Sequence, residues 1–387
     1  MDKKYNDDVI VLCEEHYNPL GIIRTLGEAG IRPTVVIKRN PSMKIASKSR
    51  YIGRLHSVDN YDEALNWIIA NYSNCEGKTF ILTSDDVAVR CLEERYDELK
   101  DNFVFFNAGS NGRIAHFQNK EVLYRLAEKH GMRVARVWRV KKGEIPDDIE
   151  YPIITKPIES YDGWKSDYYI CNDESDLVAA YDRIASDSDL LLQRYVKKVT
   201  ERTYEGCSVA CGKDVLFAIE ARYTYTLADS YSMEMTVANP ADDEVEVALR
   251  EMFAEIGFEG IFEVEFMEDA DGNLWFLEIN FRNSTWSWAS TKLDMPLPII
   301  WMNGMRDGRI PDGVERVVPE GYRALTEQPD FHFRVRRERL ISLSDWLKAV
   351  KTADCLYFYD RHDWRPCFTA WWCVIGNFVK RKLGLAK

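Results

Sequence analysis

Short apolar runs alternate with amphipathic stretches over the first hundred residues. Four runs of strand length occur there, VIVLC (9–13), TVVI (34–37), TFILT (79–83) and FVFF (103–106). Three stretches of helical periodicity separate them, at 22–29, 61–71 and 86–97. Alternating strands and helices predict a parallel sheet with right-handed crossovers. Ligands bind beyond the carboxyl ends of such strands, so the loops at 14–19 and 84–86 are expected to face a cleft.

The pattern changes after about residue 112. Helices are predicted at 119–130 and 174–186, and strands at 152–157, 190–196, 207–211 and 215–223. This mixture predicts an α+β region that follows an α/β domain. We therefore expect a parallel-sheet domain at 1–112, a second domain at 113–310 and an extension at 311–387. The second domain would divide into a small lobe, about 113–192, and a large lobe, about 193–310.

Composition narrows the class of protein. The 387 residues are 46% apolar and 29% charged, which is typical of a globular chain. The net charge of −12 excludes a general nucleic-acid binder, because such proteins need a basic field. The first residues, MDKKYNDDVIVLCEEH, lack the apolar core of an export signal, and no run of 18 apolar residues occurs. We expect a cytoplasmic protein.

Residues 261–284, IFEVEFMEDADGNLWFLEINFRNS, contain the strongest chemical signal. Two alternating arms flank the turn sequence Asp271-Gly272-Asn273, which predicts a β-hairpin. The hairpin would place Glu265 near Glu278, with Asn280 and Arg282 on the same face because side chains alternate along a strand.

Two carboxylates and an amide oxygen are hard ligands that suit Mg²⁺ bound to nucleotide phosphates. Arg282 would then meet the negative charge that develops during phosphoryl transfer. The alternative is an acidic outer face of an ordinary hairpin.

The sequence FLEINFRNS resembles the end of the ATP-grasp core, in which a Glu-x-Asn motif follows a further acid by thirteen residues. Glu265 and Glu278 have this spacing. The resemblance implies an ATP-grasp fold preceded by a Rossmann-like domain, with Glu265, Glu278 and Asn280 holding Mg²⁺, or Mn²⁺ as an alternative. Arg282 and Arg222 would contact the transferring phosphoryl group.

Weaker matches in the right order extend the resemblance backward. They imply that Lys120 and Lys156 bind ATP phosphates, that Gln193, Tyr195 and Val196 contact adenine, and that Glu205 holds the ribose, with Glu201 as a less favoured candidate. The loop ESYDGWKS (159–166), which would cover the phosphates, has one glycine where many relatives have several. Lys165 is the candidate side-chain clamp in that loop.

The sequence also resembles one branch of the family, the carboxylate–amine ligases that include D-aspartate ligase. The features are EINFRNS, SKSRY (47–51) and YDRHDWRPCF (359–368). The resemblance implies that a small-molecule carboxylate is activated as an acyl phosphate and then transferred to an amine, with an amino acid such as aspartate and a cell-wall precursor as candidates. A non-catalytic ATP-binding module and an ATP-grasp phosphotransferase are the alternatives.

Two basic segments each allow two interpretations. Residues 31–54 hold seven Lys or Arg and no acid, either as a solvated loop or as a landing site for an anionic substrate. The tail at 365–387 is rich in Trp and Phe and has basic residues at 380–382 and 387. It would either pack on the enzyme or lie peripherally at the inner face of the membrane. The sequence leaves the oligomeric state undetermined.

Overall fold

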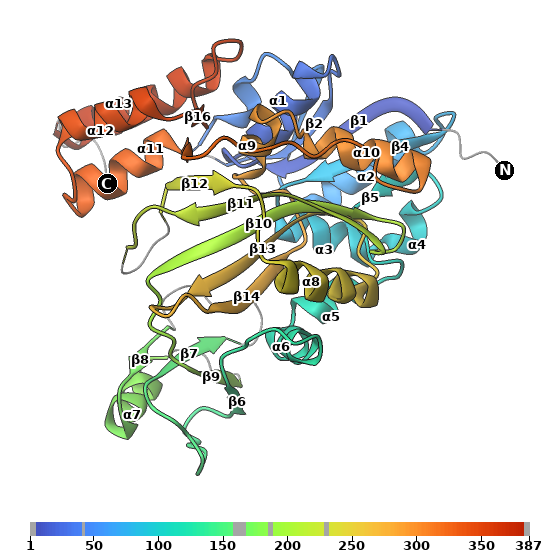
Figure 1. Cartoon of the computed structure of the whole chain (residues 1–387). Coiled ribbons are helices and arrows are strands. Elements are labelled where there is room, and N and C mark those ends of the chain that lie inside the picture. The colour runs from blue at the N-terminus through green and yellow to red at the C-terminus, as the bar shows by residue number, and fades with distance from the viewer. Residues whose placement is uncertain (1–4, 41–42, 158–167, 185–188, 228–231, 383–387) are drawn as a thin grey trace.

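The computed structural model describes residues 5–40, 43–157, 168–184, 189–227 and 232–382. Three sheets organise these residues, as Figure 1 shows. The loop at 159–166 and its Lys165 lie outside the described residues, so the expectation of a phosphate-covering clamp stays a prediction.

A five-stranded parallel sheet forms the first domain, in the order β3-β2-β1-β4-β5. Its strands are β1 (Tyr5–Glu14), β2 (Thr34–Lys38), β3 (Arg54–Val58), β4 (Lys78–Thr83) and β5 (Phe103–Phe105). Its helices are α1 (Pro19–Glu28), α2 (Tyr61–Tyr72), α3 (Asp86–Glu94) and α4 (Tyr96–Leu99), with a short 3₁₀ turn η1 (Ala46–Lys48). Strand β3 was not predicted, because its sequence RLHSV lies at the sheet edge, is largely exposed and lacks an apolar run.

A seven-stranded sheet forms the middle of the molecule, in the order β14-β13-β10-β11-β12-β15-β16. Its strands are β10 (Thr200–Val209), β11 (Asp214–Tyr223), β12 (Glu234–Ala238), β13 (Gly260–Glu268), β14 (Leu274–Asn280), β15 (Tyr322–Leu325) and β16 (Cys355–Leu356). All neighbours are antiparallel except β15 and β16. Helix α8 (Asp243–Ile256) packs on β11.

Helices α9 (Ser287–Lys292) and α10 (Leu297–Asp307) join the first domain to the large sheet. Both contact α1, and both also contact β10. Trp301 of α10 is fully buried and packs edge-on against Phe80 and Phe106 of the first domain, with ring centroids 5.8 and 4.9 Å apart. One continuous hydrophobic core therefore spans the first domain and the large sheet.

A four-stranded sheet forms the small lobe and has a core of its own. It consists of β6 (Val137–Val140), β7 (Ile153–Pro157), β8 (Ile170–Cys171) and β9 (Leu190–Arg194), with helix α7 (Glu174–Arg183). Helices α5 (Arg113–Gln118) and α6 (Lys120–Lys129) precede it, and α6 packs on β14. In Figure 1 the small lobe stands apart from the first domain, beyond the edge formed by β13 and β14.

The C-terminal extension adds β15 and β16 to the large sheet. Its other elements are α11 (Glu327–Asp330), a π-helical turn η3 (Phe331–Arg337), α12 (Leu343–Thr352) and α13 (Arg365–Lys382). The predicted fold class, an α/β domain followed by an α+β region, is confirmed. Among the described residues, no helix combines the length and hydrophobicity needed to cross a bilayer.

Candidate functional site

The hairpin of β13 and β14 lies at the edge of the large sheet that faces the small lobe. Its register pairs Glu265 with Glu278 and Glu263 with Asn280. Directly paired residues share one face of a sheet, so these four side chains converge. The structure thus brings together Glu265, Glu278 and Asn280, as the sequence suggested.

Asn280 and Arg282 form a polar chain beside these carboxylates. The Asn280 amide nitrogen donates to Glu263 Oε2 at 3.0 Å and to Glu265 Oε1 at 2.8 Å. The Asn280 oxygen accepts from Arg282 Nη2 at 3.1 Å. This oxygen could bind a metal beside the carboxylates only if the amide group flipped, because its nitrogen now faces them. Arg282 also bonds Oδ2 of Asp86, the first residue of α3, at 2.9 Å. Burial opposes its charge, but Asp86 and Glu263 outweigh this and raise the pKa of Arg282.

Five carboxyl groups share this face of the sheet, supplied by Glu201, Glu205, Glu263, Glu265 and Glu278. Burial and the nearby carboxylates raise the pKa of Glu263 and of Glu265 well above the ordinary value. A bound cation would relieve this repulsion. Glu263 was missed by the sequence interpretation, although its position two residues before Glu265 on the same strand was a usable signal.

The donors suit Mg²⁺ shared with a nucleotide. In the part of the chain that the structure describes, no group of three or more His, Cys, Asp or Glu is arranged as a complete metal site. Mg²⁺ in phosphoryl-transfer sites is held by one or two carboxylates together with substrate phosphates, and not by an all-protein cage. Glu265 and Glu278 therefore fit as the protein's share of such a site.

A cavity of about 390 Å³ lies between the small lobe and the hairpin. Its polar lining includes Lys120, Lys156, Gln193, Glu201, Glu265 and Glu278. Its apolar lining includes Tyr124, Ile154, Ile170, Leu227, Met267 and Leu277. The volume is within the range of small-molecule and cofactor sites.

Two lysines line this cavity. Lys120 is the first residue of α6 and is buried, and Lys156 lies on β7. Burial and the charge of Lys120 lower the pKa of Lys156 to about 8, while Glu278 acts in the opposite direction. Two ammonium groups that line one cavity and lower each other's tendency to be charged suit the phosphates of a nucleotide.

The end of β9 and the residues that follow it also line the cavity. Gln193 is buried, and its amide nitrogen reaches the Ala135 carbonyl at 3.5 Å. Tyr195 and Val196 also line the cavity, but the Tyr195 N–H donates to the Pro152 carbonyl at 2.8 Å. Of its two backbone groups, Tyr195 therefore has only the carbonyl to offer to adenine.

The structure separates the two candidate ribose ligands. Glu201 lines the cavity and is paired with Lys198. Glu205 does not line it. Its carboxyl is fully buried and accepts from Ser284 Oγ at 2.7 Å and from Ser287 Oγ at 2.8 Å, and burial raises its pKa to about 7. Glu201 is therefore the better placed of the two candidates, because Glu205 lies four residues farther along β10 and outside the cavity lining; the ribose contact itself stays a prediction.

Arg222 is also not brought to the site. It pairs with Arg202, which in turn pairs with Phe266, so it lies on the face of the sheet opposite Glu265. There it bonds Glu268 Oε1 at 3.0 Å. Strand alternation thus turns its side chain away from the hairpin carboxylates, and a contact of Arg222 with the transferring group stays a prediction that this geometry does not support.

A second cavity of about 200 Å³ adjoins the first. Both cavities are lined by Glu265 and Glu278. The rest of its lining comes from distant parts of the chain: Tyr17 and Asn18; Tyr223; Ser232 and Met233; Glu263; Arg282, Ser284, Thr285 and Trp286; and Thr326. Among the described residues the buried Thr326 hydroxyl has no hydrogen-bond partner. The sequence predicted that the loop at 14–19 faces a cleft and identified Arg282, but it did not identify the other lining residues, because they come from distant parts of the chain.

The basic segment at 31–54 does not reach this site. None of its seven Lys or Arg lines either cavity. Several have local partners, for example Lys38 with Glu14 and Arg39 with Asp59. The interpretation as a solvated surface fits these contacts.

Comparison with known proteins reveals similar structures but no similar sequences. No protein-family model matches the chain, and no curated protein matches it. An N5-carboxyaminoimidazole ribonucleotide synthetase in its ADP complex matches with a TM-score of 0.61 and 16% identity, over 80% of this chain and 79% of that one. An L-amino acid ligase from Bacillus licheniformis matches with a TM-score of 0.59 and 10% identity, over 80% and 78%.

A third similar structure is the biotin carboxylase domain of the Hydrogenobacter thermophilus 2-oxoglutarate carboxylase, in complex with MgADP, ADP and bicarbonate. It matches with a TM-score of 0.60 and 16% identity, over 79% of this chain and 71% of that one. At these identities the likeness is one of fold.

Proposed function

We propose that this chain, which has the ATP-grasp fold, is a magnesium- and ATP-dependent ligase that joins a carboxylate to an amine through an acyl phosphate. The observation that best supports this is the pair of adjoining cavities that share Glu265 and Glu278. A nucleotide in the larger cavity would direct its terminal phosphate toward this shared wall. A substrate in the smaller cavity would approach the same wall from the other side.

The larger cavity has the groups that nucleotide binding requires. Gln193, Tyr195 and Val196 would contact the base, and Glu201 the ribose. Lys120 and Lys156 would hold the phosphates. Mg²⁺ held by Glu265 and Glu278 would neutralise phosphate charge and align the reacting groups. The similar synthetase bound to ADP and the carboxylase domain bound to MgADP support this assignment of nucleotide and metal.

The smaller cavity suits a small substrate with a carboxylate. Arg282 is the cation in its lining, and Ser232, Ser284, Thr285 and Thr326 supply hydroxyl groups. In the first step a carboxylate oxygen would bond the γ-phosphorus while the bond to the β-phosphate oxygen breaks and ADP leaves. In the second, the amine nitrogen would bond the acyl carbon while phosphate leaves, and a proton passes from the amine to solvent. Arg282 stabilises the charge on the transferring phosphoryl group by position alone.

An amino acid such as aspartate is the proposed carboxylate. Its size suits a cavity of about 200 Å³, and an amino-acid ligase is among the similar structures. A role in making a cell-wall precursor in the cytoplasm is supported by the sequence resemblance to D-aspartate ligase. The two partners are thus small molecules.

The test is ADP and phosphate release from purified protein with Mg-ATP. The panel comprises L- and D-amino acids, including both aspartates, with and without amine acceptors, beside a Glu278→Gln variant. Release that requires a carboxylate and an amine, and is lost in the variant, is the expected result. ATP binding without release across the panel would favour a non-catalytic module. Phosphoryl transfer to a substrate without amide formation would favour a phosphotransferase, and failure to bind ATP would refute the assignment.

A further inference from the structure

Helix α13 presents a stripe of exposed aromatic side chains. Trp364, immediately before the helix, and Phe368 and Trp372 on it are 54%, 60% and 66% exposed. They follow one another at intervals of four residues, so they lie along one face. Their ring centroids are 6.2 and 6.1 Å apart, and the Phe368 and Trp372 rings are stacked. Large aromatics at this exposure are uncommon on a soluble surface and indicate a binding function.

The same helix buries a different face. Ala370 is buried, and Trp371 packs edge-on against Phe331 and Trp346, at 5.6 and 6.0 Å. This face of the tail therefore packs on the protein, as one of the two sequence interpretations predicted. The aromatic stripe is the face that remains outside that packing.

Further apolar side chains are exposed on the neighbouring helix. Leu340, Leu343 and Leu347 are each about half exposed, and Leu343 and Leu347 share one face of α12. Helix α12 contacts α13 through Trp346 and Trp371. Figure 1 shows both helices at the upper left of the molecule, whereas the small lobe lies at the bottom.

Charge in this region has the opposite sign to that of the whole protein. Residues 331–387 contain twelve Lys or Arg and five Asp or Glu, whereas the complete chain has a net charge of −12. Seven of the described cations there are exposed: Arg336, Arg337, Arg339, Lys348, Lys351, Arg361 and Arg365. Two of the five acids, Asp360 and Asp363, are buried. The surface around the aromatic stripe is thus locally basic.

We propose that α12 and α13 rest on an anionic lipid bilayer, with Trp364, Phe368 and Trp372 inserted at the level of the headgroups. Exposed aromatics beside cations are the combination that interfacial helices use, since the rings bury apolar area and the cations attract anionic headgroups. A stripe of three rings extends only about 12 Å along a helix. That is small for a stable protein interface, which buries about 800 Å² on each partner, so lipid suits it better than a second protein.

This contact leaves the proposed active site accessible. The larger cavity is lined mainly from the small lobe and the hairpin, and no side chain of α12 or α13 that the structure describes lines either cavity. Binding to lipid is therefore independent of whether the ligase assignment is correct.

The test is sedimentation of the full-length protein with vesicles of phosphatidylcholine containing 30% phosphatidylglycerol. We expect the protein to bind these vesicles, and to bind vesicles of phosphatidylcholine alone at least tenfold more weakly. Binding to the anionic vesicles should also weaken in 0.5 M salt, since each cation near an anionic surface contributes about fivefold to the affinity. The variant Trp364→Ala/Phe368→Ala/Trp372→Ala should lose at least tenfold in binding. A matched control, Val87→Ala/Val178→Ala/Val247→Ala, removes three exposed apolar side chains from other helices and should bind as the wild type does.

Circular dichroism and thermal unfolding of each variant establish that it is folded. Absence of wild-type binding to the anionic vesicles, or equal binding by the aromatic variant, would overturn the proposal. So would a dimer in light scattering that the aromatic substitutions convert to a monomer, because the stripe would then serve a second copy of the chain.

Discussion

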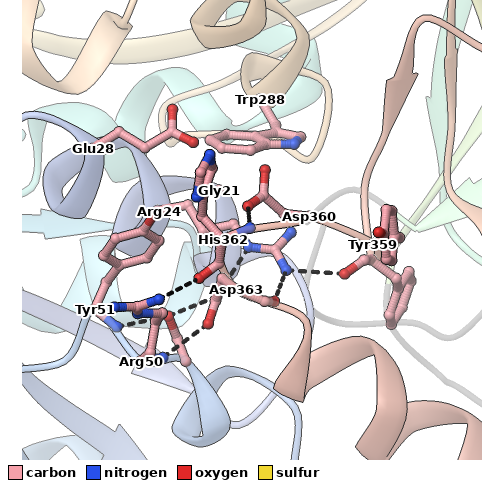
Figure 2. Close-up of polar contacts among 12 residues, drawn as sticks. Gly21, Arg24, Glu28, Arg50, Tyr51, Trp288, Tyr359, Asp360, His362 and Asp363 are labelled. Carbon is pink, nitrogen blue, oxygen red and sulfur yellow. Dashed lines mark hydrogen bonds and ion pairs between the residues drawn. The ribbon is translucent and has the colours of Figure 1, made fainter.

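Arg24 of the first domain forms a buried ion pair with Asp363 of the C-terminal extension, 339 residues away, at a distance of 3.0 Å. Figure 2 shows that the two side chains meet between α1 and the segment that follows β16. Arg24 also donates to the carbonyls of Tyr357, Phe358 and Asp363. Asp363 accepts from the Ser49 hydroxyl and the Arg50 N–H. The pair therefore fixes the extension on the first domain.

Arg24→Met should destabilise the protein by about 3–5 kcal/mol. The substitution leaves a buried carboxylate and three carbonyls without their donor, which costs more than the pair itself contributes. Urea unfolding measures the loss. Arg90→Met, which breaks an exposed pair with Glu94, is the control and should cost less than about 1 kcal/mol. Equal effects of the two substitutions would contradict the assigned role of Arg24.

Tyr357→Phe should weaken binding of the amino-acid substrate and leave nucleotide binding unchanged. The Tyr357 hydroxyl bonds the carbonyls of Tyr17 and Asn18 at 2.9 and 2.7 Å, and these two residues line the smaller cavity. Loss of about 1 kcal/mol of positioning energy should raise the KM of the amino-acid substrate about fivefold, with little change in the Kd of ADP.

Tyr181→Phe is the matched control for that prediction. Its buried hydroxyl likewise donates to a backbone carbonyl, that of Glu144, but it lies in the small lobe away from the smaller cavity. Its loss should lower the free energy of unfolding without raising the KM of the amino acid. A KM that changes equally in both variants would mean that Tyr357 has only a structural role.

Glu201→Gln and Glu205→Gln should have opposite consequences. Glu201 lines the nucleotide cavity, so the first substitution should weaken ADP binding about tenfold through loss of a hydrogen bond to a charged acceptor. Glu205 is bonded to Ser284 and Ser287, so the second should lower stability by about 1–3 kcal/mol and leave ADP binding unchanged. Calorimetric titration with ADP measures both. The reverse result would restore Glu205 as the ribose ligand.

ADP binding should weaken as the pH rises through 8. The pKa of Lys156 is lowered to about 8 by burial and by Lys120. The side chain is therefore a charged ammonium below this pH and a neutral amine above it. Phosphate favours the charged form, so ADP binding should take up a proton near pH 8 and lose almost tenfold in affinity between pH 7.5 and 9. Titrations in buffers of different ionisation enthalpy measure the proton. Lys156→Arg keeps its charge and should flatten the dependence; an unchanged profile would exclude Lys156 as its source.

The sequence by itself determined the features that depend on local periodicity. Apolar runs and helical stretches predicted four of the five parallel strands and the order of the elements. The alternation around Asp271-Gly272-Asn273 predicted the hairpin that pairs Glu265 with Glu278. These succeed because strand and helix periods act over a few residues. Edge strand β3 was not predicted, since it has no apolar run of its own.

Only the tertiary structure decided which residues meet across long separations. The sequence favoured Glu205 over Glu201 as the ribose ligand. Only the position of the cavity, which Glu201 lines, distinguishes the two. Pairing across β10 and β11 places Arg222 on the face of the sheet opposite Glu265. Tyr17, Thr285 and Thr326 come together from three parts of the chain, and Tyr357 and Arg24 hold one of those parts in place. Such contacts depend on how whole sheets pack, and no local pattern of residues specifies that packing.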